Sequence, residues 1–451
     1  MALHRLAAAT SDAFAAAAVA AGPVARRHAA ALACFGRSPP LPPPHAPVED
    51  RRQPFVSSPP SPSSSSTAAP EASRQSDGIS KVLVTKERLE ALLNAEIVHF
   101  ARALKPHPIT LQQILSQHDP EVLRNFLLEE LPIRWARRLH LIESMPKWKA
   151  IPHMRVIRSL YTDAFRRMRM VPHADAENFR VTLQTIQRRN SSMVMHVVRG
   201  TRAMKDQLGL SDDEVDEFLD DFLMARIGTD ILSSQYLAIT RPGGATSVID
   251  PQCDPVRVVQ TAATDAIRLC KYHYGYAPKV DVVDVGQVKF PFITEYLNYI
   301  LFELFKNSLR AVTERFDEAA CEQHPVRAVV CGDEATVVIR ISDHGGGIPL
   351  ENLHKVWSYL YTTAKPRARH RDDEEEDDSD EDVAPMAGFG CGLPLSRNYA
   401  SYVGGRLDIN TMPHQGTDAY LYLNRLGDSV EVVDVEPKAT LPSRGFLPRM
   451  R

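Results

Sequence analysis

One stretch of the chain, FELFKNSLRA, carries a carboxylate, an amide and a guanidinium at helical spacing. Glu303, Asn307 and Arg310 stand at positions i, i+4 and i+7, so in a helix they share one face. An amide oxygen is a hard ligand that suits Mg²⁺, and a nearby carboxylate can orient or deprotonate an attacking hydroxyl group. Polar helix faces are usually solvated, so this pattern alone is weak evidence for a catalytic site and must be combined with further motifs. The opposite face is apolar and consists of Leu301, Phe305, Leu309 and Val312.

A second stretch, ISDHGGGIP, places a carboxylate where a strand gives way to a flexible turn. Asp343 ends the strand, and Gly345, Gly346 and Gly347 allow the backbone to turn sharply and to approach a ligand. Such a carboxylate can accept a hydrogen bond from an exocyclic amine, for example the N6 amino group of adenine. An ordinary glycine-rich turn is the alternative. The stretch does not have the form G-x-x-x-x-G-K-[ST], so it is not a P-loop.

A third stretch, GFGCGLPLSRNYASYVGG, contains Gly388, Gly390 and Gly392 just before a helix that we expect to begin near Leu393. Backbone N–H groups at a helix N-terminus form an anion site, so phosphate groups fit there. The motif G-x-G-x-G alone is common in proteins. It becomes informative here because it follows the other two stretches in a particular order.

Regular elements must position these residues. Apolar residues recur at three- and four-residue steps along the N-terminal half, which predicts an antiparallel helix bundle whose apolar positions pack in a core. The recurring positions are Leu89, Leu93, Ile97, Phe100 and Leu104; Phe179, Leu183, Ile186, Met193 and Val197; and Val215, Phe218, Leu219, Phe222 and Ile227. LRNFLLEELPIRWARRL also reads as an amphipathic helix, apart from Pro132.

The pattern changes after RPGG (241–244), which suggests a domain boundary. A helix (256–272), the strand-like KVDVVDV, a long helix (294–316) and AVVCG come next, followed by TVVIRIS, the glycine loops, another helix, RLDIN and DAYLYL. Helices combined with mostly antiparallel strands predict a two-layer α/β sandwich. The fold class is therefore α+β, with a bundle over 79–245 and a sandwich over 246–430.

In this order, E-x-x-x-N, D-x-G-x-G, G-x-G-x-G and then Gly416–Thr417 resemble the histidine-kinase-like ATPase superfamily, which includes heat-shock chaperones, DNA gyrase and mismatch-repair ATPases. Within it, ELFKNSLRA, YLYTTA (359–364) and GFGCGLPLSRNYASYVGG resemble the mitochondrial pyruvate dehydrogenase and branched-chain 2-oxoacid dehydrogenase kinases. EELPIRWARRL and FLDDFLMARIG extend this resemblance into the bundle. It runs from about Ile79 to Gly427.

The resemblance implies an N-terminal antiparallel four-helix bundle followed by an ATP-binding domain. It also implies a role for each matching residue. Glu303 would be the general base for a substrate serine, Asn307 the Mg²⁺ ligand and Asp343 the adenine ligand, with Thr417 nearby. Phosphoryl transfer asks mainly for positioning and charge neutralisation, which such a set supplies. The other residues implied to bind ATP are Arg310, Gly345, Gly347, Thr362, Thr363, Gly388, Phe389, Gly390, Cys391, Gly392 and Leu393.

The resemblance also implies partners. Family members phosphorylate serines on the decarboxylase subunit of a 2-oxoacid dehydrogenase complex and switch the complex off. The lipoyl domain of the acyltransferase core and a second copy of the chain are further expected partners.

Departures from the family pattern leave the target open between the pyruvate and the branched-chain complex. Tyr299 stands where pyruvate-directed members usually carry a His. Tyr299, FPFI (290–293) and YGYAP (274–278) resemble the branched-chain kinase, whereas FELFKN and SYLYTTA resemble the pyruvate-directed kinases. The family's R-H-N reads Arg188, Arg189 and Asn190 without a His, and the Asp-Trp pair near the C-terminus is absent because the last Trp is Trp357.

The two ends and one internal segment have distinctive compositions. The first 48 residues are Ala-rich with four Arg and one acid, which is typical of an organelle transit peptide, with a disordered tail as the alternative. Together with the resemblance, this predicts the mitochondrial matrix. The Pro/Ser-rich linker extends this unfolded region to residue 78, and residues 431–451 form a tail. The segment 364–387 holds RARHR and DDEEEDDSDED, and we expect it to form the lid over ATP. A charge block of this kind predicts a solvated loop. The alternative is an electrostatic role, in which the acidic lid repels ATP unless its own basic half folds against it.

Composition excludes other classes of protein. A net charge of −3, from 53 basic and 56 acidic residues, gives no case for nucleic-acid binding. The six cysteines form no C-x-x-C pair or zinc spacing, and no apolar run is long enough to span a bilayer. Cys391 in the phosphate loop could confer oxidant sensitivity, but a buried filler is the favoured interpretation.

Two alternative functions stay open on the sequence. A two-component histidine kinase would need a phospho-accepting His in the bundle, and His99 and His196 lack the expected context. A non-catalytic ATP-binding scaffold is disfavoured by the intact Glu303, Asn307 and Asp343.

Overall fold

A computed structural model describes residues 85–243, 246–363 and 390–433. The predicted transit peptide and linker (1–78), the acidic lid (364–387), Gly388, Phe389 and residues 434–451 of the tail lie outside the described residues. The boundary drawn at 245/246 stays a prediction.

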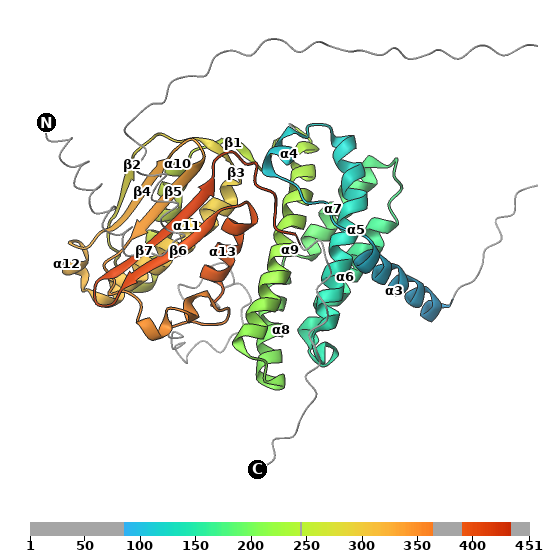
Figure 1. Ribbon diagram of the computed structural model, residues 1–451, viewed down its shortest axis with the longest axis horizontal. Helices are drawn as coiled ribbons and strands as arrows, with labels where there is room; N and C mark the ends of the chain where they lie inside the picture. The colour runs from blue at the N-terminus through green and yellow to red at the C-terminus, as the bar shows by residue number, and fades with distance from the viewer. Residues whose placement is uncertain (1–84, 244–245, 364–389, 434–451) are drawn as a thin grey trace, which may run out of the picture. The chain divides into compact units, whose positions relative to one another are not determined.

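The N-terminal half of the described chain is helical, as predicted (Figure 1). Its helices begin at side-chain caps such as Thr85, Asp119 and Ser211, whose oxygens accept hydrogen bonds from backbone N–H groups of the first turn. The longest helices pack in series: α5 contacts α3, α6 and α9, and α6 contacts α8. The bounds are α3 (Lys86–Ala103), α4 (Leu111–Ser116), α5 (Pro120–Ser144), α6 (Pro152–Arg169), α7 (Ala176–Arg189), α8 (Met193–Leu208) and α9 (Asp212–Ile239).

Two helical expectations need correction. The apolar series from Phe179 to Val197 belongs to two helices, because α7 ends at Arg189, and Asn190 and two serines follow before α8 begins. Asn and Ser side chains compete with the helix backbone for hydrogen bonds, which favours a break. In addition, the amphipathic pattern predicted for α5 is lost over 130–136, where every residue is buried. The polar residues Glu130 and Arg134 of this stretch can be buried because they pair with each other.

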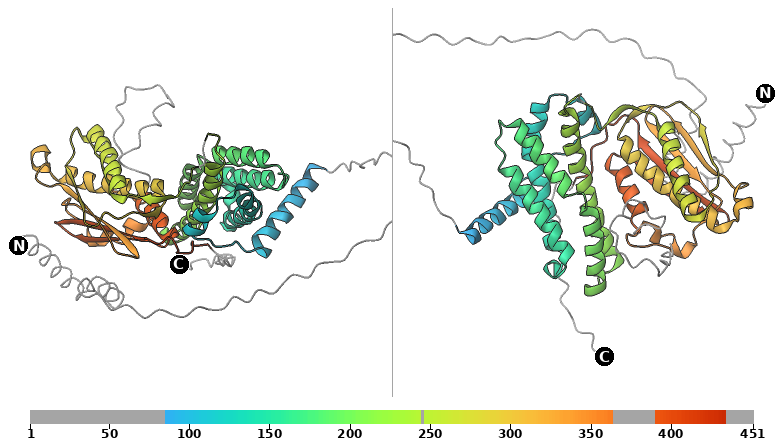
Figure 2. Two further views of the ribbon diagram at one scale, coloured as in Figure 1. Left: turned by 90° about the horizontal axis from the view of Figure 1, so that it is seen from above. Right: turned by 180° about the vertical axis from the view of Figure 1, so that it is seen from behind.

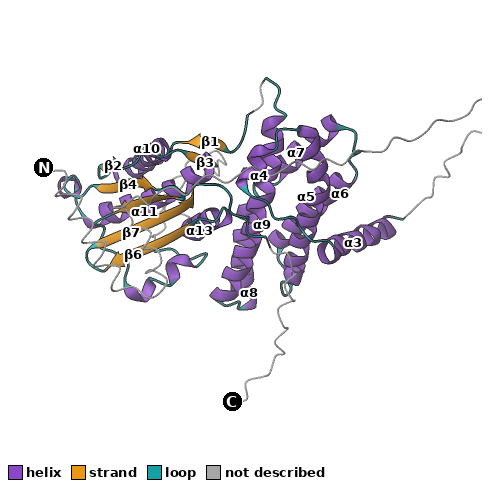
Figure 3. Ribbon diagram, turned by 45° about the horizontal axis from the view of Figure 1, so that its top comes forward, coloured by secondary structure: helices purple, strands orange, loops and turns teal. Residues whose placement is uncertain are grey.

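The C-terminal half builds one five-stranded sheet and the helices that cover it (Figure 3). The strand order is β2-β4-β5-β7-β6; β2 runs parallel to β4 and the other pairs are antiparallel. The bounds are α10 (Pro255–Tyr274), β2 (Val280–Asp284), α11 (Thr294–Arg315), α12 (Glu318–Cys321), β4 (Val326–Gly332), β5 (Thr336–Ser342), α13 (Gly392–Tyr402), β6 (Arg406–Met412) and β7 (Gly416–Asn424).

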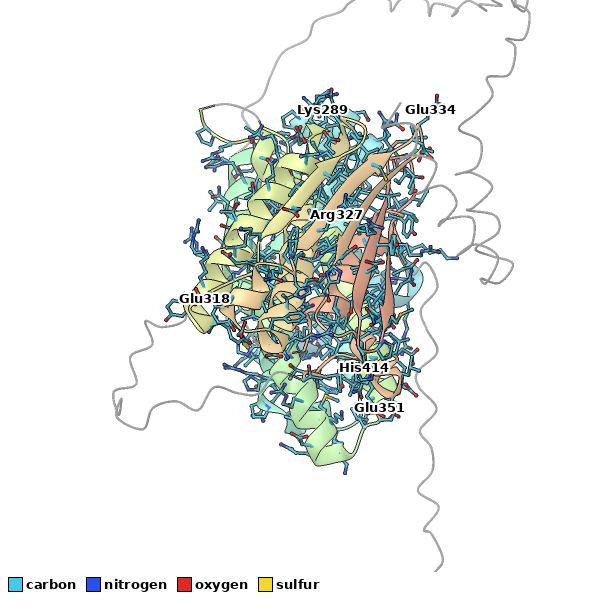
Figure 4. All side chains as sticks on the ribbon, turned by 90° about the vertical axis from the view of Figure 1, so that its left-hand side faces the viewer. Lys289, Glu318, Arg327, Glu334, Glu351 and His414 are labelled. Carbon is cyan, nitrogen blue, oxygen red and sulfur yellow. The ribbon has the colours of Figure 1, made fainter. Side chains whose placement is uncertain are left out.

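Side-chain alternation decides which face of the sheet is covered. Val337, Ile339 and Ile341 of β5 are buried, whereas the residues between them are only partly buried. Helices α10, α11 and α13 contact the strands, and α10 and α11 lie together on one side of them (Figure 2). Arg327 of β4 is exposed on the face turned to the viewer in Figure 4. The sandwich therefore has two layers, as expected.

A short two-stranded sheet was not predicted. It pairs β1 (Asp250–Cys253) with β3 (Phe290–Phe292) in antiparallel orientation. Both strands are brief and each contains a proline, so neither shows the alternation that identifies a strand.

Contacts join the helical half to the half that contains the five-stranded sheet, within one compact unit that includes all described residues. Helix α9 packs against α13, whose first turn contains Gly392 and Leu393. Among the described residues, no helix is both long enough and apolar enough to cross a membrane.

Candidate active site

Helix α11 carries the carboxylate of the site because one face of the helix is anchored in the core. Leu301, Phe305 and Leu309 are completely buried beneath it. Glu303 is only 8% exposed and Lys306 only 6%, and Lys306 Nζ lies 2.6 Å from Glu303 Oε1. Burying a charge is costly unless it is paired, so the ion pair explains how both side chains can be held here.

The second oxygen of Glu303 faces the start of α13. A Cβ atom added to Gly392 would lie 2.1 Å from Glu303 Oε2, so only glycine permits this approach. The N–H groups of Gly392 and Leu393 have no partner inside the helix, and Pro394 has no N–H at all. A carboxylate base and an anion-binding helix terminus are thus in direct proximity.

Asp343 occupies the other end of the site, at the end of β5. It is 9% exposed, and its Oδ1 accepts hydrogen bonds from the N–H groups of Gly345 (2.9 Å) and Thr417 (3.3 Å). Ser308 of α11 also bonds to this carboxylate. Burial raises the pKa of Asp343 in spite of these hydrogen bonds. The structure therefore brings together Asp343 and Thr417, the two residues that the resemblance assigns to the neighbourhood of adenine.

The glycine loop after Asp343 is held close to the sheet. Gly347 has a φ of +73°, and a Cβ there would lie 2.3 Å from the carbonyl oxygen of Met412, so no other residue fits without a shift. Arg315, at the end of α11, donates to the carbonyl oxygens of His344 (2.8 Å), Gln415 (2.9 Å) and His414 (3.0 Å).

The segment Tyr359–Thr363 supplies the remaining wall. Arg310 Nη2 donates to Thr363 Oγ1 at 3.2 Å, and its Nε donates to Glu314 Oε1 at 2.9 Å. Leu360 has a φ of +65°. A side chain other than glycine in this left-handed region costs of order 1–3 kcal/mol and persists only where its surroundings enforce it.

Cys391 stands at the N-cap of α13. Burial raises the pKa of its thiol to about 11, and the Glu303 carboxylate contributes in the same direction. This supports the filler interpretation of Cys391, because a reactive cysteine needs a lowered pKa.

These groups enclose a cavity of about 410 Å³, within the range of small-molecule sites. Its apolar walls include Ile348, Val356 and Ile409, and Asn307 is exposed on its α11 side. Of the residues predicted to act, those that line the cavity are Glu303, Asn307, Arg310, Asp343, Gly345, Gly347, Thr362, Thr363, Gly390, Gly392, Leu393 and Thr417. Cys391 is not among the lining residues, and Gly388 and Phe389 lie outside the described residues.

The donor chemistry fits Mg²⁺ bound together with phosphate groups. Asn307 offers one amide oxygen to the cavity. The described residues contain no cluster of three or more His, Cys, Asp or Glu that could hold a metal by themselves. Mg²⁺ usually keeps several waters and takes only one or two protein ligands plus substrate phosphates, so one protein oxygen is compatible with it.

Tyr299 lies one turn before Glu303. Burial raises the pKa of Tyr299 well above its usual value, and the charge of Glu303 adds to this. The side chain packs against Tyr399, with ring centroids 5.2 Å apart. A tyrosine here therefore stays protonated, so its hydroxyl keeps a proton to donate.

The sequence reasoning missed three residues of the site: Lys306, Ser308 and Arg315. Lys306 follows Glu303 at helical i+3 spacing, which was a usable signal. Ser308 and Arg315 act on loops that are distant in sequence, and no local pattern indicates such contacts.

Comparison with known proteins adds a separate set of observations. Residues 108–252 match the family described as mitochondrial branched-chain alpha-ketoacid dehydrogenase kinase. Residues 294–426 match the histidine kinase-, DNA gyrase B- and HSP90-like ATPase family.

Curated relatives match over most of their length. The mitochondrial [pyruvate dehydrogenase (acetyl-transferring)] kinase of Arabidopsis thaliana is 35% identical over 351 residues, which cover 74% of this chain and 95% of the relative. Isozyme 4 of Mus musculus is 32% identical over 376 residues, covering 77% and 88%. The Schizosaccharomyces pombe kinase of the same name is 35% identical over 259 residues, covering 56% and 60%.

Proposed function

The chain belongs to the mitochondrial 2-oxoacid dehydrogenase kinase family of ATP-binding protein serine/threonine kinases, and from this premise we propose that it phosphorylates and inactivates the decarboxylase subunit of the pyruvate dehydrogenase complex. The observation that carries the proposal is the position of Glu303: a buried carboxylate, held by Lys306, that faces the anion-binding start of α13. A base beside a phosphate site is what transfer to a hydroxyl group needs.

The residues of the cavity that match the family then have the following roles in catalysis and ATP binding. Asp343 accepts a hydrogen bond from the adenine amino group. The N–H groups of Gly392 and Leu393 bind phosphate oxygens, together with Thr362 and Thr363. Glu303 takes the proton of the substrate serine, while Lys306 keeps its carboxylate in place. When bound, Mg²⁺ neutralises charge on the phosphates, and Asn307 would hold it.

The choice of the pyruvate complex rests on the relatives. The Arabidopsis thaliana, Schizosaccharomyces pombe and Mus musculus proteins all bear the name of pyruvate dehydrogenase kinases. The family matched by residues 108–252 bears the name of the branched-chain kinase, so the branched-chain complex is the alternative outcome of the test.

Location and partners follow from the same proposal. The relatives' names support a mitochondrial location. We propose that the protein acts in the matrix, in the same compartment as its proposed substrate complex. A lipoyl domain of the acyltransferase core and a second copy of the chain complete the proposed assembly.

Phosphate transfer tests the proposal. The full chain, labelled ATP and Mg²⁺ are incubated with the purified decarboxylase subunits of the pyruvate and branched-chain complexes in parallel. We expect acid-stable label on serine of the pyruvate subunit. Label on the branched-chain subunit alone would reassign the target, and acid-labile label would indicate a histidine kinase. ATP binding without any transfer would contradict kinase activity on these substrates and favour a scaffold.

A further inference from the structure

Two carboxylates on the bundle helix α9 face the active-site segment that carries Thr362 and Thr363. Asp216 and Asp220 are one helical turn apart, and Tyr359 lies against both. The backbone N–H of Tyr359 donates to Asp216 Oδ1 at 2.7 Å, and its hydroxyl donates to Asp220 Oδ1 at 2.7 Å. Tyr359 is 1% exposed, whereas Asp216 and Asp220 are half-buried, so both bonds are partly shielded from water.

Asp220 also reaches the second phosphate-binding element. Its Oδ2 lies 3.1 Å from Nη2 of Arg397 on α13, and the guanidinium of Arg397 sits 5.3 Å from the centre of the Trp357 ring. Asn398 of α13 donates to the Tyr359 hydroxyl at 2.7 Å. One carboxylate of the bundle therefore contacts both Tyr359, in the segment that ends at Thr363, and the helix whose N-terminus lines the cavity.

The arrangement of α9 is unfavourable without these partners. Like charges one turn apart on a helix repel each other. Burial raises the pKa of Asp216, and the charge of Asp220 adds to this effect. The partners on the active-site segment and on α13 therefore offset part of the repulsion between Asp216 and Asp220.

The backbone conformation of the segment from Tyr359 to Thr363 needs surrounding contacts to stabilise it. Leu360, directly after Tyr359, has a φ of +65°, a conformation that the chain does not adopt by preference. Gly390 is packed on it so closely that a Cβ there would lie 2.6 Å from the Tyr361 carbonyl oxygen. At the far end, Arg310 bonds to Thr363. Tyr359 is thus the fixed point from which Thr362 and Thr363 are presented to the cavity.

We propose that Asp220 is a positioning residue for ATP: through Tyr359 and Arg397, helix α9 of the bundle sets the geometry of the two elements that bind the phosphates. The proposal rests on the ATP site described under the proposed function. If so, contacts made by the helical half of the chain contribute to the affinity for ATP.

Direct binding of Mg-ATP to the full chain, measured by calorimetry, tests this. We expect Asp220→Ala to raise the Kd for ATP roughly tenfold, which corresponds to about 1.4 kcal/mol. Tyr359→Phe should raise the Kd in the same direction. In the double variant the two effects should not add, because both changes break one connection.

Asp213→Ala is the matched control: an exposed aspartate of the same helix, in its first turn. It should leave the Kd unchanged. A purely structural role would lower the thermal midpoint and the fraction of binding-competent protein but leave the Kd of that fraction as in wild type, and this result in both single variants would overturn the inference. If the wild-type chain itself binds no ATP, the proposed function fails instead.

Discussion

Individual side chains of the site combine charge and burial in an unusual way. Glu and Lys are almost never fully buried unless they are paired, and Glu303 and Lys306 satisfy this condition with each other. Breaking a buried pair by removing one partner typically costs about 3–5 kcal/mol, because the other charge is left alone. Lys306 therefore contributes both to the stability of α11 and to the orientation of the Glu303 carboxylate.

Cys391 provides a prediction at this scale. With a pKa of about 11, roughly one thiol in three thousand is ionised at pH 7.5, since each pH unit below the pKa lowers the thiolate fraction tenfold. Iodoacetamide should therefore modify Cys391 far more slowly than glutathione at pH 7.5, and the rate should keep rising up to about pH 10. Quantitative mass spectrometry of the full chain measures this. Modification at pH 7.5 as fast as that of glutathione would show that the thiol is accessible and ionised.

Residue types that carry chemistry could be recognised from the sequence, whereas their tertiary partners could not. Glu303, Asn307 and Asp343 stand out because a short pattern surrounds each of them, and the structure assembles all three around one cavity. Arg315 binds carbonyl groups about 30 and 100 positions away along the chain. An arginine at the end of a helix usually points to solvent, so nothing local distinguishes this one.

At the scale of elements, the site is where α11 and α13 meet. The two helices pack against each other, and the contact that matters is between Glu303 and Gly392. Long elements with strong periodicity, such as α9, α11 and β5, were predicted from the sequence. Three features could not be predicted from the sequence: the break between α7 and α8, the complete burial of residues 130–136 in α5, and the short pair β1–β3. Polar side chains or tertiary contacts decide the outcome there.

Gly392→Ala should test the contact between these helices. The new methyl group would lie 2.1 Å from Glu303 Oε2, so the carboxylate or the helix start must move. We expect kcat to fall by roughly 100-fold, because a displacement of about 1 Å at the reacting groups has effects of this size. Steady-state kinetics with a decarboxylase subunit measures it, and Ser401→Ala at the other end of α13 serves as control. An unchanged kcat would mean that the base does not need this approach.

At the scale of the whole molecule, a buried ionic cluster connects the C-terminal segment to the bundle. Arg134 of α5 binds both Glu130 (2.7 Å) and Glu431 (2.6 Å), and Tyr402 of α13 donates to Glu431. Gly228 of α9 leaves room for the cluster, since a Cβ there would lie 2.7 Å from Arg134 Nη1. Helices α5, α9 and α13 and the last described residues are thereby joined at one point.

Glu431→Ala should destabilise the protein by about 3–5 kcal/mol, because Arg134 would lose one of its two carboxylates while remaining buried. Urea denaturation of the full chain measures this. Asp408→Ala is a matched control: it breaks the Arg406–Asp408 pair, which has the same 2.6 Å separation but is 50% and 39% exposed. That change should cost at most about 1 kcal/mol. Equal effects of the two substitutions would contradict the role assigned to the buried cluster.

The most direct test of the account is the rate of phosphate transfer by Glu303→Gln. The full chain, saturated with Mg-ATP, is mixed with the pyruvate dehydrogenase decarboxylase subunit, and serine phosphorylation is followed in a single turnover. Loss of the base should slow transfer by roughly 10²–10⁴-fold, while the Kd for ATP stays close to that of wild type. Transfer at the wild-type rate would show that Glu303 is not the base, and the assignment of the active site on α11 would then be wrong.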